Sequence, residues 1–315
     1  MRGVCGLFLA GAVLAPSGGA IAKDFSSAIV LPKNSVINYS VEHTLSKTAP
    51  GSNAVGSVTA TVHYRLTIDP NDKGYLVRIA FVSADLPPGG TPEARARLQQ
   101  GMAVLSGVQF QAANDLSPTE IIDWCTQVGR VVDSLADTMG LKRDDPTMTA
   151  TRNLYLAMTP EQATNALLPE WVFPSIVQDV ELDLGPAVTA QNTQIVEGGA
   201  QLKTTESVQL KSVDTAASKA MVAYHSGIDP SSANALARAT VQSMQAQVTD
   251  FPKFTEAQLA SLKIEQATDC AYEMDLRSGL ATRSDCTKTV TSLDEKGASQ
   301  RQTDHWIITQ DLVKP

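Results

Sequence analysis

The sequence is poor in aromatic residues, cysteine and histidine. Phe, Trp and Tyr make up 5% of its 315 residues, and it has four cysteines and four histidines. So few aromatic rings disfavour a stacking platform for single-stranded nucleic acid. The net charge of −8 and the pI near 5.0 disfavour binding to nucleic-acid phosphates or anionic lipid surfaces through a general positive field. We therefore expect no nucleic-acid partner.

Motifs for catalysis and metal binding are also missing. The histidines stand apart, without the spacing of a metal site, at His43, His63, His225 and His305. We find no nucleophile elbow, phosphate-binding loop, dinucleotide fingerprint or Ser-x-x-Lys motif after the first 22 residues. Acidic residues from distant strands can still meet, so an enzyme stays open. The sequence favours a protein without cofactor or metal.

A long apolar run occurs at the start of the chain and not again. Arg2 precedes an apolar block over residues 3–15, and a stretch of small residues then ends in Ala20-Ile21-Ala22. A positive start, a block too short to cross a bilayer and an Ala-x-Ala ending predict a secretory signal peptide over 1–22. We expect cleavage between Ala22 and Lys23, with an uncleaved anchor as the alternative. The expected location is the periplasm, or else the extracellular medium, with no transmembrane segment after cleavage.

Alternating hydrophobicity predicts a mostly antiparallel sheet. The clearest strand covers residues 58–68, where every second residue is apolar, and a polar turn at 69–74 joins it to a strand at 75–81 as a hairpin. Residues 23–34 are expected to form a flexible lead-in. The other predicted strands cover residues 37–41, 108–112, 208–211, 219–225, 262–276, 280–292 and 303–313.

Helix-capping residues lie between the strand groups. Thr91 and Pro92 predict the start of a helix that ends near residue 106. A capping box at residues 117–120 predicts a helix over 118–139, with Cys125 on its apolar face as a buried, inert thiol. Similar signals predict helices after Thr159 and after Asp229, and a small one near 255–261.

The order of these elements predicts the fold class. Strands, helices, strands, a helix and final strands indicate an α+β fold with a mostly antiparallel, curved sheet, either open or forming an incomplete barrel, and with helices inserted between the strand groups. We expect one large domain over 35–315, or two similar halves at 35–186 and 187–315. No residue-level repeat is present to establish a duplication.

Cys270 and Cys286 carry the strongest chemical signal. A three-residue loop at 277–279, with Gly279 in the left-handed position, would close a hairpin between them. Counting back along both strands places the two cysteines opposite each other, within reach of a disulfide. In an oxidising compartment the bond should form and stabilise the fold by roughly 3 kcal/mol at most. A redox pair is disfavoured because no Cys-x-x-Cys motif is present.

The layout resembles the periplasmic carriers of lipoproteins and lipids of the LolA and LppX type. The resemblance rests on the export signal, the long amphipathic strands at 58–68 and 75–81, and the helices between strand groups. In that family an incomplete barrel surrounds an apolar pocket plugged by helices. The segments 270–276 and 304–309 are also similar to exported proteins of Gram-negative bacteria that have no assigned activity. No diagnostic motif transfers a functional residue.

Three classes of function follow. The first is a non-enzymatic periplasmic binder of an apolar small molecule, a lipid or a lipoprotein, sheltered between the curved sheet and the helices at 92–106 and 118–139. The second is an envelope structural or interaction protein, and a hydrolase without a recognisable motif comes third. The apolar strand faces would serve a binder only if the helices leave part of them open. The sequence does not decide between a cavity and a solid core.

Overall fold

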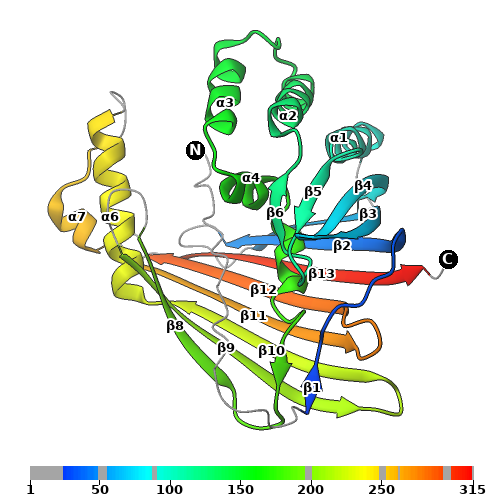
Figure 1. Cartoon of the computed structure of the whole chain (residues 1–315). Coiled ribbons are helices and arrows are strands. Elements are labelled where there is room, and N and C mark those ends of the chain that lie inside the picture. Colours follow the sequence, from blue (N-terminus) through cyan, green and yellow to red (C-terminus); the bar gives the residue numbers. More distant parts are fainter. Residues whose placement is uncertain are drawn as a thin grey trace.

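A single eleven-stranded sheet forms the centre of the computed structural model, which describes residues 24–48, 55–86, 91–195, 201–247, 253–261, 263–293 and 299–313 (Figure 1). Its strand order is β6-β5-β4-β3-β2-β13-β12-β11-β10-β9-β8, and all neighbouring strands are antiparallel. The sheet is open, because its edge strands β6 and β8 do not pair with each other. The predicted α+β class with an antiparallel sheet is confirmed.

The strands fall into two groups along the chain. The first comprises β2 (Ser35–Thr48), β3 (Val55–Asn71), β4 (Gly74–Asp85), β5 (Gln109–Ala112) and β6 (Pro118–Ile121). The second comprises β8 (Val188–Ile195), β9 (Gln201–Asp214), β10 (Lys219–Ile228), β11 (Lys263–Asp275), β12 (Ala281–Leu293) and β13 (Ser299–Val313). The groups join where β2 pairs with β13, so the two ends of the chain meet in the middle of the sheet.

The helices lie between these strands in sequence. They are α1 (Pro92–Ala103), α2 (Trp124–Met139), α3 (Pro146–Leu156), α4 (Pro160–Leu167), the 3-10 turn η1 (Pro169–Trp171), α5 (Val172–Ser175), α6 (Pro230–Gln247) and α7 (Glu256–Ser261). Figure 1 shows α1 to α4 grouped above the sheet and α6 with α7 at one end of it. The predicted caps at Thr91, Thr159 and Asp229 are confirmed, since each side chain accepts a hydrogen bond from a backbone N–H in the first turn of its helix.

One face of the sheet, here called the inner face, carries most of the core. On β2 and β3 the alternating residues Tyr39, Val41, Tyr64 and Leu66 are buried there, as a period of two requires. The ring of Trp171, from η1, stacks on Tyr39 with centroids 5.0 Å apart and lies 5.3 Å from Tyr64. The η1–α5 segment therefore covers this half of the inner face.

The expectation of a flexible lead-in is wrong for its described part, residues 24–34. β1 (Phe25–Ser26) pairs with β7 (Glu181–Leu182) in a two-stranded sheet, and Phe25 is 2% exposed. The Ser27 hydroxyl donates to the carbonyl of Val177. The segment is fixed because the backbones of Asp179 and Val180 hydrogen-bond to that of Ser27, and because Phe25 is part of the main apolar core.

The predicted helix over 118–139 begins six residues late. Residues 118–121 form β6, in which Ile121 faces Phe110 of β5 and is 3% exposed. The Ser117 hydroxyl donates to Asp115 and does not cap a helix. Sheet pairing and the burial of Ile121 outweigh the local capping signal, so α2 starts at Trp124 after Asp123 in a left-handed conformation.

Gly279 tests how closely the N-terminal segment packs on the 275–280 turn. Its φ is +73°, and a Cβ there would lie 2.5 Å from the carbonyl oxygens of Ser27 and Ala28. We predict that Gly279→Ala lowers the free energy of unfolding by about 2–4 kcal/mol, because backbone must move. Urea unfolding followed by circular dichroism measures the change.

Gly129 supplies the matched control. It lies within α2 with open space around its Cα, so Gly129→Ala should stabilise the protein by about 0.5–1 kcal/mol. Equal effects of the two substitutions would contradict the close packing at Gly279.

Candidate functional site

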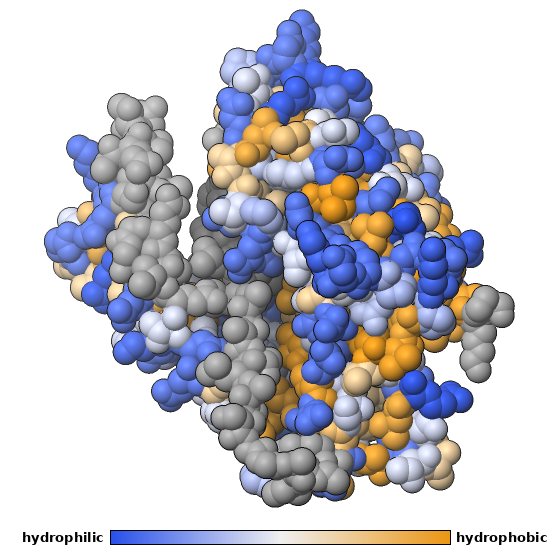
Figure 2. Space-filling model, viewed as in Figure 1, coloured by the Kyte–Doolittle hydropathy of each residue, from blue (hydrophilic) through white to orange (hydrophobic). Residues whose placement is uncertain are grey.

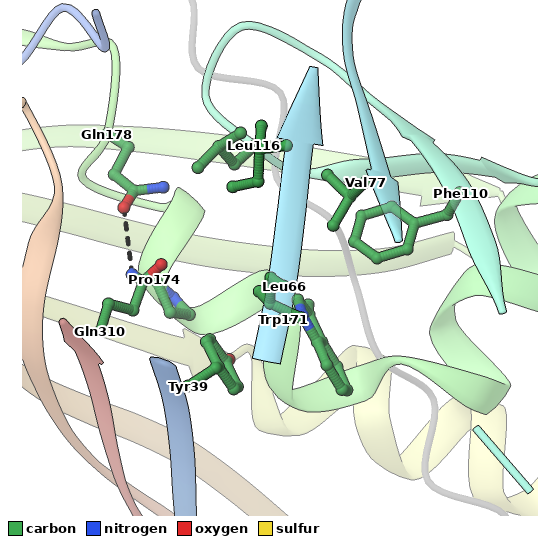
Figure 3. Close-up of a pocket in the computed structure, with 10 residues that line it drawn as sticks. Tyr39, Leu66, Val77, Phe110, Leu116, Trp171, Pro174, Gln178 and Gln310 are labelled. Atoms are coloured by element: carbon green, nitrogen blue, oxygen red, sulfur yellow. Dashed lines mark hydrogen bonds between the residues drawn. The ribbon is translucent and has the colours of Figure 1, made fainter. Parts of the chain in front are cut away.

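The space between the covered half of the inner face and the helices is almost filled. Figure 3 shows Tyr39, Leu66, Trp171 and Pro174 converging there, with a hydrogen bond from Gln310 Nε2 to Gln178 Oε1 of 3.2 Å beside them. The remaining volume is about 10 Å³, room for about one water molecule. This enclosed space cannot hold an apolar ligand.

The register of the other strands places six mainly apolar side chains in one row across the inner face. This row, the apolar stripe, is formed by Trp306, Cys286, Cys270, Tyr224, Val208 and Val188. α5 covers the Trp306 end of the stripe, where the ring centroids of Phe173 and Trp306 lie 4.8 Å apart. The other end is open: Tyr224 and Val208 are partly buried and Val188 is 64% exposed. Figure 2, drawn from the same side as Figure 1, shows hydrophobic side chains at the surface near the centre of the molecule.

A polar row runs beside the apolar stripe, two residues further along each strand. This polar stripe is formed by Asp304, Lys288, Thr268, Ser226 and Glu206, from β13 to β9. Residues two apart on a strand lie about 7 Å from each other. The inner face of the second strand group therefore presents an apolar band and a polar band side by side.

At one end of the polar stripe the charges compensate one another. Asp304 Oδ1 lies 3.0 Å from His43 Nε2, Asp304 Oδ2 accepts a hydrogen bond from Gln302 at 2.7 Å, and Lys288 stands opposite on β12. Burial acts to raise the pKa of Asp304, but the hydrogen bonds from His43 and Gln302 outweigh it and hold that pKa below its usual value. Burial lowers the pKa of Lys288, against the attraction of Asp304.

At the other end the polar stripe holds a carboxylate with few partners. Burial raises the pKa of Glu206, and a hydrogen bond from the Asn192 side chain opposes this. Burial raises the pKa of Tyr224 to about 12, and the negative charge of Glu206 contributes to this increase.

The opposite, outer face has a shallow depression of about 440 Å³. Ser207, His225 and Asp269 line it and face one another on three adjacent strands, with His225 Nδ1 2.7 Å from Asp269 Oδ1. A serine hydrolase needs these residue types, with Nε2 directed at the serine and donors for an oxyanion. Here Nε2 lies 3.5 Å from the Cβ position of Gly227, so the ring leans along its own strand. The row does not support hydrolysis.

The four histidines lie on strands, as expected, and each has an aspartate beside it. The partners of His43, His63, His225 and His305 are Asp304, Asp85, Asp269 and Asp285, at 3.0, 4.0, 2.7 and 2.8 Å. Within the described parts of the chain, no three His, Cys, Asp or Glu side chains group so that they could hold a metal ion. No helix among those residues is long and apolar enough to span a membrane.

A disulfide joins Cys270 and Cys286, which face each other on β11 and β12 as predicted. The loop is one residue longer than predicted, since Asp275 N–H donates to the Leu280 carbonyl. A bulge then falls where Met274 faces Ala281 but Glu273 faces Arg283. The two deviations cancel, so the register at the cysteines is the predicted one.

The prediction for Cys125 is wrong: its side chain is exposed. Because α2 begins at Trp124, Cys125 lies in the first turn, before the buried residues Val128, Val132 and Ala136 that pack with Met148 of α3. The predicted cleavage site at Ala22 and Lys23 lies outside the described residues.

The sequence reasoning missed the polar stripe. Lys288, Thr268 and Glu206 are distant in sequence and share no motif. A signal was present, since each of these residues lies two positions from a residue of the apolar stripe on the same strand. That signal has meaning only when the register of all five strands is known.

Asp304 provides a test of the compensated end. Asp304→Asn should lower the free energy of unfolding at pH 7 by about 2 kcal/mol, because Lys288 loses a buried partner. The folded pKa of Asp304 lies below its unfolded value of about 3.9, so this contribution is complete above about pH 4 and is lost as the pH falls further. Urea titrations at several pH values measure it.

The control is Asp285→Asn, which changes the aspartate beside His305 on the outer face. Both side chains of that pair are more than a third exposed, so less than about 1 kcal/mol is expected. A pH-independent loss in Asp304→Asn would show that its charge is not the cause.

Thiol labelling tests the state of the cysteines. Without reduction, a maleimide should modify Cys125 rapidly in the folded protein, because that thiol is exposed. Cys270 and Cys286 should react only after reduction and unfolding, as read by peptide mapping. Labelling at Cys270 in the untreated protein would contradict the disulfide.

Comparison with known proteins assigns no family. No family model matches the sequence, and no curated protein matches it. Among solved structures, the chain aligns with an outer membrane channel from Pseudomonas putida F1 at a TM-score of 0.17 and 8% identity, over 95% of this chain and 100% of that one. A score this low carries no argument about fold or function.

Proposed function

We propose that this protein is an exported, non-enzymatic binder that carries an apolar ligand or a lipidated partner on the inner face of its sheet. The supporting observation is the unequal cover of that face. Trp171 and its neighbours fill the half formed by β2 to β5, whereas the apolar stripe ends in the partly buried Val208 and the exposed Val188. Removing apolar chain from water is favourable by about 0.8 kcal/mol per methylene.

The ligand is proposed to lie on the open stripe and not in a closed pocket. The enclosed space of about 10 Å³ is too small for it. The open part of the stripe, Tyr224, Val208 and Val188, crosses the three strands β10, β9 and β8, about 10 Å at a spacing of about 4.8 Å. That length suits part of an alkyl chain, and the layout resembles that of periplasmic lipid and lipoprotein carriers.

The disulfide supports a location outside the cytosol, the periplasm or else the extracellular medium, because such bonds persist in oxidising compartments. A hydrolase is not proposed, since the histidine on the outer face is not directed at its serine neighbour. An interaction protein of the cell envelope remains the alternative to a carrier.

Native mass spectrometry of protein isolated gently from its own cell envelope tests the proposal. We predict a mass above that of the chain, reduced to the bare chain by organic extraction, because the ligand is held by apolar contact. A bare chain throughout would contradict the carrier. A complex with one defined protein that carries no lipid would support the alternative.

Val188 allows a test of where the ligand lies. Val188→Asp should weaken the binding of a neutral long-chain alcohol at least fivefold, measured by calorimetry, because it puts a charge at the open end of the stripe. Val82→Asp is the control, since Val82 is 57% exposed on β4, outside the stripe. Equal effects in the two variants would contradict binding on the stripe.

A further inference from the structure

Glu206 has no cationic partner among the described residues. Its pKa reflects burial and a hydrogen bond from Asn192, with no lysine, arginine or histidine contributing. Asp304, at the other end of the polar stripe, has His43, Gln302 and Lys288 around it. A partly buried carboxylate without a counter-charge costs free energy that a bound cation would recover.

The groups around Glu206 match an ammonium ion. Tyr224 is the neighbouring residue of the apolar stripe on β10, and its pKa responds to the charge of Glu206. Ser226 faces Glu206 in the β9–β10 ladder, and its hydroxyl can accept a hydrogen bond. A carboxylate, a hydroxyl and an aromatic ring together favour a positively charged nitrogen.

An anionic group fits this place poorly. Glu206 would repel it, and the charge of Lys288 on the same stripe is already balanced by Asp304.

We propose that Glu206 binds the ammonium group of an amphiphile whose apolar chain lies over the open part of the apolar stripe, on Tyr224, Val208 and Val188. This inference rests on the proposed function, because it names the chemistry of the ligand. The two stripes are parallel and about 7 Å apart, so a chain on one places its polar end within reach of the other.

Calorimetry with three probes of equal chain length tests the inference. Dodecylamine, dodecanol and dodecanoate are titrated, below their aggregation concentrations, into the disulfide-bonded protein at pH 7. We expect dodecylamine to bind about tenfold more tightly than dodecanol, as one charge-assisted interaction provides. Dodecanoate should bind most weakly.

Two variants assign the preference to Glu206. In Glu206→Gln the amine and the alcohol should bind within about twofold of each other, with the alcohol binding as in the wild type. Glu265→Gln is the matched control, because Glu265 is exposed on the outer face of β11, and it should keep the full preference. Thermal unfolding of both variants establishes that they are folded.

The outcomes separate this inference from the proposed function. Equal binding of amine and alcohol to the wild type, a preference that persists in Glu206→Gln, or tighter binding of dodecanoate would overturn the ammonium site and leave the carrier standing. Absence of binding by all three probes would count against both.

Discussion

The antiparallel register from β8 to β13 is the constraint on which the candidate site depends. Side chains alternate between the faces of a strand, so a shift of one residue would move every inner-face residue to the outer face. The Cys270–Cys286 disulfide joins two facing residues of this register, in the covered part of the apolar stripe. With that pairing in place, neighbouring strands carry Trp306 and Tyr224 into the same row.

The same register places the polar stripe on the inner face, beside the apolar stripe. Stability of the fold does not require polar groups at these positions. Buried opposite charges that face each other, such as Lys288 and Asp304, cost desolvation energy, and an apolar replacement is often as stable. Their presence beside an apolar band favours recognition, because binding sites commonly combine an apolar lining with a few placed polar groups. The two ends of the polar stripe then differ in role: Asp304 is satisfied within the protein, and Glu206 is left for a ligand.

Local pattern was enough for much of the fold. The alternation over 58–68 predicted β3, and Thr159 with Gln162 formed the capping box that starts α4. The similar signal at Ser117 misled because β6 offers its residues sheet pairing and a buried place for Ile121. β8 was not predicted, since residues 191–194 are polar and only its pairing with β9 defines it as a strand.

The candidate site was beyond reach of the sequence for a different reason. The disulfide could be predicted because a single hairpin sets its register. The stripes need the register of five or six strands at once, and the cover of the inner face depends on Trp171 and Phe173, in a segment for which no helix or strand was predicted. Pairing between strands that are distant in sequence cannot be predicted from the pattern of residues within a short segment.

The most direct test of ligand binding on the inner face is photo-crosslinking with a long-chain alkyl amine that carries a diazirine on its chain, followed by peptide mapping. The account predicts adducts on the apolar stripe, at Val188, Val208 or Tyr224, that an excess of unlabelled amine removes. Adducts confined to the outer face around His225, or spread evenly over the surface, would contradict it.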